Sequence, residues 1–110
     1  MARRHLEAKG YVFETAAWRG PSGELDLVMR HADEVVFVEV KTRHGEEMGR
    51  AEESLSRRQQ RILLATAAAY VEGHPDLDDP IWRIDLVAVT LDSVGIVRRV
   101  SHVENGVLDG

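Results

Sequence analysis

The chain alternates apolar and polar residues over several short stretches, a period of two that is typical of β-strands. Two of these stretches, 24–30 and 35–42, are separated by small or polar residues and predict a β-hairpin. Glycine and proline at 20–23 predict a turn just before that hairpin. The pattern predicts five strands in all, at residues 11–18, 24–30, 35–42, 82–91 and 96–103.

Two further segments have the spacing of helices. Residues 2–9 predict a short helix that ends at Gly10. Ser56 can cap a longer helix, and Gln59 completes a capping box; Gly73 ends that helix. The expected buried face of the longer helix consists of Leu55, Ile62, Leu63, Thr66, Tyr70 and Val71. The resulting order is α-β-β-β-α-β-β, which predicts an α/β or α+β fold with a mostly buried sheet.

The hairpin residues divide between two faces, because alternate side chains on a strand point in opposite directions. One face is wholly apolar and is expected in the core: Leu25, Leu27, Met29, Val36, Val38 and Val40. We expect a four-residue turn at 31–34, since Ala-Asp is not a favoured two-residue turn. A turn of either length places Asp26 opposite Glu39 in the neighbouring strand. In the same register, Glu24 faces Lys41.

Two facing carboxylates destabilise a sheet unless solvent, a raised pKa or a cation relieves their repulsion. Asp26 and Glu39 together suit a hard divalent cation such as Mg²⁺, and Lys41 adds an amine on the same face. A metal, two acids and a lysine are the equipment of metal-dependent phosphodiester hydrolysis. The alternative is that these residues form an ordinary solvated face of paired surface charges.

Length and composition limit the class of protein. The 110 residues fit one domain, and 44% hydrophobic with 30% charged residues excludes a disordered tail. The longest apolar stretch is too short to span a membrane, so no membrane partner is expected. The absence of cysteine excludes disulfides, a thiol nucleophile and a cysteine zinc site, and it predicts a reducing, cytoplasmic location.

The charges are unevenly distributed. A net charge of −5 argues against indiscriminate binding of nucleic acid, yet the acidic excess lies entirely in residues 62–110. A polyanion is therefore expected to meet residues 1–61. Candidate phosphate contacts there are Arg43, Arg57, Arg58 and Arg61. The alternative is that these arginines belong to a solvated helix face and pair with nearby acids.

The hairpin motifs resemble those of a known bacterial family. The segments GELDLV at 23–28 and VFVEVKTR at 36–43 are similar to the YraN-like family, and the similarity continues through Gly49 to 103–105. That family is grouped with Holliday-junction-resolvase-like members of the PD-(D/E)xK nuclease superfamily. The resemblance implies an α/β restriction-endonuclease-like core, in which helices flank a central mixed β-sheet.

The resemblance also implies roles for individual residues. Asp26 is then the metal-binding aspartate and Glu39 the second acidic ligand, with the Val40 carbonyl beside it. Lys41 is the catalytic lysine, and Glu24 is a supporting group. The implied cofactor is Mg²⁺ or Mn²⁺, and the implied activity is phosphodiester hydrolysis of structured or branched DNA.

Two departures from the family pattern leave alternatives open. One is Gln59, where family members carry a lysine on the long helix, with arginines at 57, 58 and 61 around it. Family members also have a longer first helix that carries a glutamate, so we expect a single nuclease-like domain over 1–110 with a truncated first helix. A catalytically inactive module of the same fold, which binds nucleic acid or a protein, is the alternative function, and a purely structural role is a third. DNA is the expected partner, and a homodimer stays open because a junction has twofold symmetry.

Overall fold

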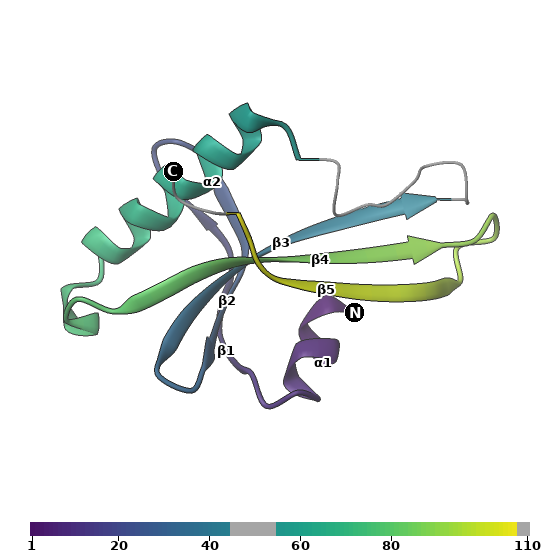
Figure 1. Ribbon diagram of the computed structural model, residues 1–110, viewed down its shortest axis with the longest axis horizontal. Coiled ribbons are helices and arrows are strands. Elements are labelled where there is room, and N and C mark those ends of the chain that lie inside the picture. Colours follow the sequence, from purple (N-terminus) through teal and green to yellow (C-terminus); the bar gives the residue numbers. More distant parts are fainter. Residues whose placement is uncertain (45–54, 108–110) are drawn as a thin grey trace.

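The computed structural model describes residues 1–44 and 55–107 and contains a five-stranded sheet with a helix against each face (Figure 1). The predicted order α-β-β-β-α-β-β is confirmed. The elements are α1 (Ala2–Glu7), β1 (Val12–Arg19), β2 (Glu24–His31), β3 (Glu34–His44), α2 (Arg57–Glu72), the 3₁₀ turn η2 (Pro75–Leu77), β4 (Ile81–Leu91) and β5 (Val97–Val107). Glycines at 45 and 49 predict a loop over residues 44–50, of which residues 45–50 lie outside the described residues.

The sheet is mixed, as expected. Its strands lie in the order β1-β2-β3-β4-β5; β3 and β4 run parallel, and the other neighbours are antiparallel. Parallel neighbours need a crossover, and α2 lies in the connection between these two strands (Figure 1). The predicted α/β class is therefore confirmed.

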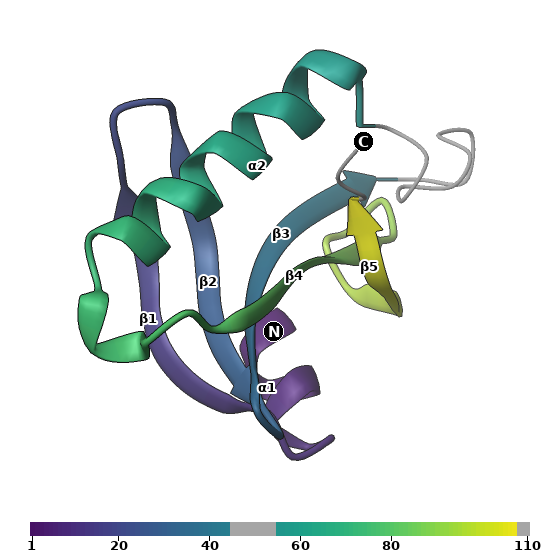
Figure 2. The same cartoon turned by 60° about the vertical axis from the view of Figure 1, so that its left-hand side comes forward.

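Both faces of the sheet are buried (Figure 2). On one face, Leu63 and Tyr70 of α2 pack in one cluster with Phe37 of β3. On the other face, Leu6 of α1 packs with Met29 and other apolar residues of the sheet. Within the described ranges, no helix is long and apolar enough to cross a membrane.

The start of α2 has the predicted capping box. The backbone N–H of Gln59 donates to Ser56 Oγ at 3.1 Å, and the N–H of Ser56 donates to Gln59 Oε1 at 2.9 Å. Leu63, Thr66 and Tyr70 of the expected apolar face are buried. Local sequence alone therefore fixes both where this helix begins and which side packs on the sheet.

The turn between β2 and β3 is shorter than expected. His31 pairs with Glu34, so only Ala32 and Asp33 form the turn, and the four-residue prediction is wrong. Ala32 has φ +54°, a left-handed backbone that alanine rarely adopts and that the sequence does not signal. The predicted register is kept, because both turn lengths give it, as Leu27 paired with Val38 shows.

The start of β2 is drawn towards α2. A Cβ on Gly23 would lie 2.8 Å from Ile62 of α2, so the chain passes this helix at close range. Leu25 then packs in the cluster under α2, while Leu27 packs on the opposite face near α1. The expectation that Leu25 and Leu27 share a face is therefore wrong. The alternation slips at Asp26, the residue between them.

Replacing Ser56 by alanine removes the cap acceptor and should lower the free energy of unfolding by about 1 kcal/mol. Ser56→Asp keeps an acceptor and should stay close to the wild type. Urea denaturation of the three proteins measures the difference. Equal stability of Ser56→Ala and the wild type would contradict a stabilising role for the capping box.

Candidate functional site

Asp26 lies where β2 separates from β3. The ladder of pairs runs from His31–Glu34 to Leu27–Val38 and stops there. Beyond it, the Val40 backbone N–H donates to Asp26 Oδ2 at 2.8 Å. A side-chain carboxylate thus takes the place of a backbone carbonyl as acceptor, which satisfies the β3 amide and holds the carboxyl group between the diverging strands.

Glu39 and Lys41 lie next to this carboxyl group. Lys41 Nζ is 3.6 Å from Glu39 Oε2, and both side chains are largely buried, at 20% and 17% exposed. Burial, together with the hydrogen bond and charge of the Asp26 carboxyl group, raises the pKa of Glu39 to about 7, against the opposite effect of Lys41. The structure therefore brings Asp26, Glu39 and Lys41 together, as the hairpin register predicts.

Val40 connects these groups through its backbone. Its N–H orients Asp26, and its side chain lines the same cleft as Asp26 and Thr42. The cleft has a volume of about 390 Å³ and lies between α1 and the sheet. Of the three site residues Asp26, Glu39 and Lys41, only Asp26 lines this surface cleft.

Glu24 does not join this group as predicted. It pairs with Arg19 of β1, and the Arg19 Nε to Glu24 Oε2 distance is 3.0 Å. The expectation that Glu24 faces Lys41 is wrong, because β2 leaves β3 at Asp26 while keeping its pairing with β1. The side chain of Glu24 is partly exposed, at 39%.

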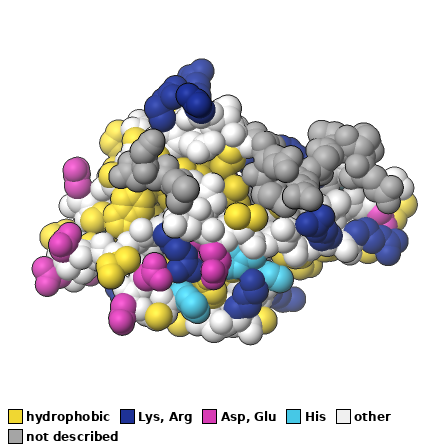
Figure 3. Space-filling model, in the orientation of Figure 1, with side chains coloured by type: hydrophobic (Ala, Val, Ile, Leu, Met, Phe, Trp, Pro, Cys, Tyr) yellow, Lys and Arg dark blue, Asp and Glu magenta, His cyan; other side chains and the backbone are white. Residues whose placement is uncertain are grey.

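The predicted basic residues lie apart from the Asp26–Glu39 pair. Figure 3 shows Lys and Arg side chains gathered over the start of α2. Three exposed residues in the first turns of that helix are Arg57, Arg58 and Arg61. Arg43 follows Lys41 by two positions on β3, so it shares the same face of the strand, and it is partly exposed. Their contact with phosphate stays a prediction.

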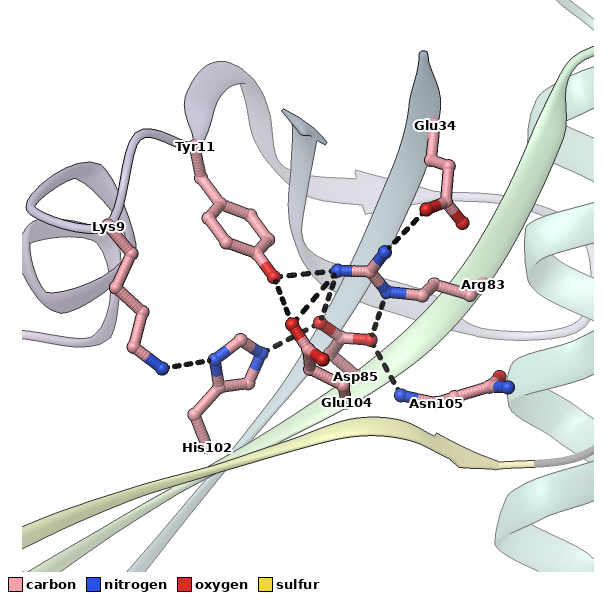
Figure 4. A network of polar contacts seen from close by, with 8 residues as sticks. All are labelled: Lys9, Tyr11, Glu34, Arg83, Asp85, His102, Glu104 and Asn105. Atoms are coloured by element: carbon pink, nitrogen blue, oxygen red, sulfur yellow. Dashed lines mark hydrogen bonds and ion pairs between the residues drawn. The ribbon is translucent and has the colours of Figure 1, made fainter. Parts of the chain in front are cut away.

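A second polar cluster is buried between β4 and β5 (Figure 4). Arg83 Nε donates to Asp85 Oδ1 at 2.9 Å, which confirms the ion pair that their shared strand face indicates. His102 Nε2 lies 2.7 Å from Asp85 Oδ2, and the His102 side chain is only 2% exposed. The histidines of the chain have no metal-ligand spacing, which predicts surface or loop positions for them, and for His102 this prediction is wrong.

His102 connects two charged side chains through its two ring nitrogens (Figure 4). Lys9 Nζ lies 2.8 Å from His102 Nδ1, and an ammonium group is a donor only, so Nδ1 accepts in this contact. The other ring nitrogen, Nε2, faces the Asp85 carboxylate. This chain of contacts attaches the end of α1 to the β4–β5 pair.

The cluster also ties the other strands together. Arg83 donates to Glu34 of β3 at 2.9 Å and to the Tyr11 hydroxyl at 2.6 Å, and the Asn105 N–H donates to Asp85. Burial raises the pKa of Tyr11 to about 12, which keeps its hydroxyl protonated. Over the described residues, no buried side-chain nitrogen or oxygen lacks a partner. The cluster thus satisfies itself and is structural.

Glu39 should make the metal-free protein less stable as pH rises. An acid whose pKa is near 7 when folded and 4.5 when unfolded binds more protons in the native state between these values. The free energy of unfolding should fall by roughly 3 kcal/mol from pH 4.5 to 7 and level off above. Urea denaturation in EDTA should show this slope in the wild type and lose it in Glu39→Gln. Glu72→Gln, at an exposed helix end, should retain the slope, and equal slopes in all three proteins would refute the buried carboxyl pair.

Removing the Asp85 carboxylate should destabilise the fold strongly. Asp85→Ala leaves Arg83 and the Asn105 N–H without their buried acceptor and should cost about 3–5 kcal/mol in urea denaturation. Asp33→Ala, in the exposed β2–β3 turn, should change stability by less than about 0.5 kcal/mol. Similar losses in both variants would contradict the role assigned to the cluster.

Comparison with known proteins places this arrangement in a family. The profile of the family described as "Uncharacterised protein family UPF0102" matches residues 1–89. A UPF0102 protein of Roseiflexus castenholzii is 39% identical and aligns over 96% of this chain and 82% of its own. A second, from Ruegeria pomeroyi, is 42% identical over 93% of this chain and 77% of its own. A third, from Yersinia pseudotuberculosis, is 44% identical over 82% of this chain and 78% of its own. The chain therefore belongs to the UPF0102 family, which is the YraN-like family that its hairpin motifs resemble.

Proposed function

We propose that this protein is a nuclease-like DNA-binding protein that hydrolyses phosphodiester bonds in structured or branched DNA with Mg²⁺ or Mn²⁺. The observation that carries the proposal is the contact between the Asp26 and Glu39 carboxyl groups beside Lys41, at the point where β2 leaves β3. Two acids and an amine meet there within a largely apolar sheet. Without a ligand, such buried charged groups contribute little to the stability of the fold.

The donor set fits a hard divalent cation. Carboxylate oxygens are the ligands that Mg²⁺ and Mn²⁺ prefer, and Asp26 and Glu39 supply them from neighbouring strands. The raised pKa of Glu39 supports this choice. The carboxyl pair holds a proton at neutral pH, and a cation can take the place of that proton between the two groups. When bound, the metal supplies positive charge for the developing oxyanion and lowers the pKa of a water.

The protein's own groups position the reactants. The Val40 N–H fixes the direction of the Asp26 carboxylate, and Glu39 holds the Lys41 ammonium 3.6 Å away. Lys41 can then donate to a phosphate oxygen or orient the attacking water. Arg57, Arg58 and Arg61 would bind flanking phosphates by charge-assisted hydrogen bonds.

A second candidate function is binding without hydrolysis. It is favoured by one observation: among residues 1–44 and 55–107, no three Asp, Glu, His or Cys side chains gather closely enough to hold a metal ion. Two carboxylates give a weaker site than three, and DNA binding through the arginines does not require the metal.

The proposal extends to the cellular location of the protein and to its oligomeric state. The cysteine-free chain suits a reducing cytoplasm, where bacterial DNA lies. A homodimer would match the twofold symmetry of a four-way junction, with one carboxyl pair for each of two strands.

Divalent metal should stabilise the fold through Asp26 and Glu39. At a Mn²⁺ concentration of roughly 100 times Kd, the gain is about 2.7 kcal/mol, which raises the melting temperature by about 10 °C. Asp26→Asn and Glu39→Gln should abolish the rise, while Glu72→Gln should retain it.

Incubation with four-way junctions, forks, single strands and duplexes then tests turnover, and Lys41→Ala should cut cleavage at least about 100-fold while binding persists.

The outcomes of these experiments distinguish hydrolysis from binding without hydrolysis. A metal response with cleavage of branched DNA supports hydrolysis. DNA binding without cleavage, by a wild type saturated with Mn²⁺, supports the binding module and refutes hydrolysis. A wild type with neither metal response nor DNA binding refutes both.

A further inference from the structure

The turn between β4 and β5 is held rigidly at one end of the sheet (Figure 1). Asp92 organises it: its Oδ1 accepts from the Val94 N–H at 3.0 Å and from the Ile96 N–H at 2.9 Å. Its Oδ2 accepts from Arg98 at 2.8 Å, and its own N–H donates to the Ile96 carbonyl at 2.8 Å. These hydrogen bonds, above all the one from the Ile96 N–H, lower the pKa of Asp92.

This ordered turn presents large apolar side chains to solvent. Val94 is 77% exposed, more than any other large hydrophobic residue in the described ranges, and Ile96 is 54% exposed. Hairpin turns favour Gly, Asn, Asp and Ser, and β-branched residues are poor choices there. Neither side chain contributes much to the core, so their presence calls for a contact outside the chain.

Basic residues lie between the β4–β5 turn, called the tip below, and the candidate site. Thr90 of β4 pairs with Arg43 on one side and Arg99 on the other, so both arginines lie on one row across the sheet. Lys41, paired with Ala88, lies two rows further along β3, and Glu39, paired with Leu86, lies two rows beyond Lys41. Side chains two apart on a strand share a face, so Glu39, Lys41 and Arg43 line one track that leads towards the turn.

The dimensions of this track match a DNA strand. Glu39 pairs with Leu86, and from Leu86 to Asp92 the strand spans roughly 20 Å at its ordinary rise. That length is about six base-pair steps of duplex. A phosphate backbone laid along the track would meet Arg43 and Arg99 before it reaches the apolar tip.

We propose that the β4–β5 turn, residues 92–96, is a wedge that recognises the branch point or end of a DNA duplex. Val94 and Ile96 pack against bases that lose their stacking neighbour at the branch, as inserted apolar side chains do at kinked base steps. Arg43 and Arg99 bind the phosphates between the wedge and the Asp26–Glu39 pair. The inference rests on the proposed function and adds to it the element that recognises the branch and a cleavage position about six nucleotides from it.

The arginines favour DNA over other partners. Arg98 is 65% exposed although Asp92 pairs with it, and Arg99 is exposed beside it. A second protein molecule or a membrane could also cover two apolar residues, but the row of Arg43 and Arg99 runs inward along the sheet rather than around the tip. An extended polyanion complements that row.

The test compares binding of forked and uninterrupted duplex DNA in EDTA, which prevents cleavage. The wild type should bind the fork at least about tenfold more tightly, and the double variant Val94→Ser/Ile96→Ser should lose this preference while its duplex affinity stays within about twofold. Val12→Ser/Ile81→Ser alters two residues of comparable exposure elsewhere and should keep the preference. Arg99→Ala should weaken binding to both DNAs and reduce the salt slope by about one.

Two results would overturn the wedge while leaving the proposed function intact. One is an unchanged fork preference in Val94→Ser/Ile96→Ser. The other is unchanged DNA binding with a loss of self-association in gel filtration, which would assign the tip to a contact between copies. A wild type that binds no DNA refutes the proposed function itself, so the two failures are distinguishable.

Discussion

The hydrogen bond from the Val40 N–H to the Asp26 carboxylate is the interaction on which the candidate site depends. At this point the β2–β3 ladder has ended, and β3 would otherwise have an unsatisfied amide. A carboxylate is a strong acceptor for such an amide, and the bond brings Asp26 beside Glu39. The divergence of two strands thus creates a place where acidic side chains meet inside a mostly apolar sheet.

The helices explain why the strands separate here. Gly23 lets the start of β2 pass close to Ile62 of α2, and Leu25 packs in the cluster beneath that helix. The remainder of β2 stays against β3 and packs towards α1 through Leu27. Leu25 and Val28 of β2 pack in the cluster beneath α2, and Leu27 packs in the cluster near α1, so the alternation of faces slips at Asp26. The buried Arg83–Asp85–His102 cluster keeps the far side of the sheet in place.

Much of this structure could be predicted from the sequence, and what could not depends on contacts between distant elements. The capping box of α2, the β2–β3 register and the meeting of Asp26 with Glu39 follow from local spacing. The pairing of Glu24 with Arg19 could not be read locally, since it requires β2 to leave β3.

His102 was missed for a similar reason. Its burial follows from the way β5 pairs with β4, including a register shift between Ile84 and Leu86 that brings the Asn105 N–H to Asp85. Asn105 has φ +53°, and the Asn-Gly pair at 105–106 was a signal for irregular backbone there, because asparagine adopts the left-handed region more readily than most residues. Asp85 was an available signal for a buried partner such as His102, because a carboxylate inside a sheet needs more than one hydrogen-bonding partner.

The most direct measurement is an anomalous diffraction map of crystals soaked in Mn²⁺ at neutral pH. If the carboxyl pair is a metal centre, the map will contain a peak in contact with the side chains of both Asp26 and Glu39, and none in crystals of Asp26→Asn. A fully ordered pair with no peak at saturating Mn²⁺, or a peak that contacts neither carboxylate, would contradict it.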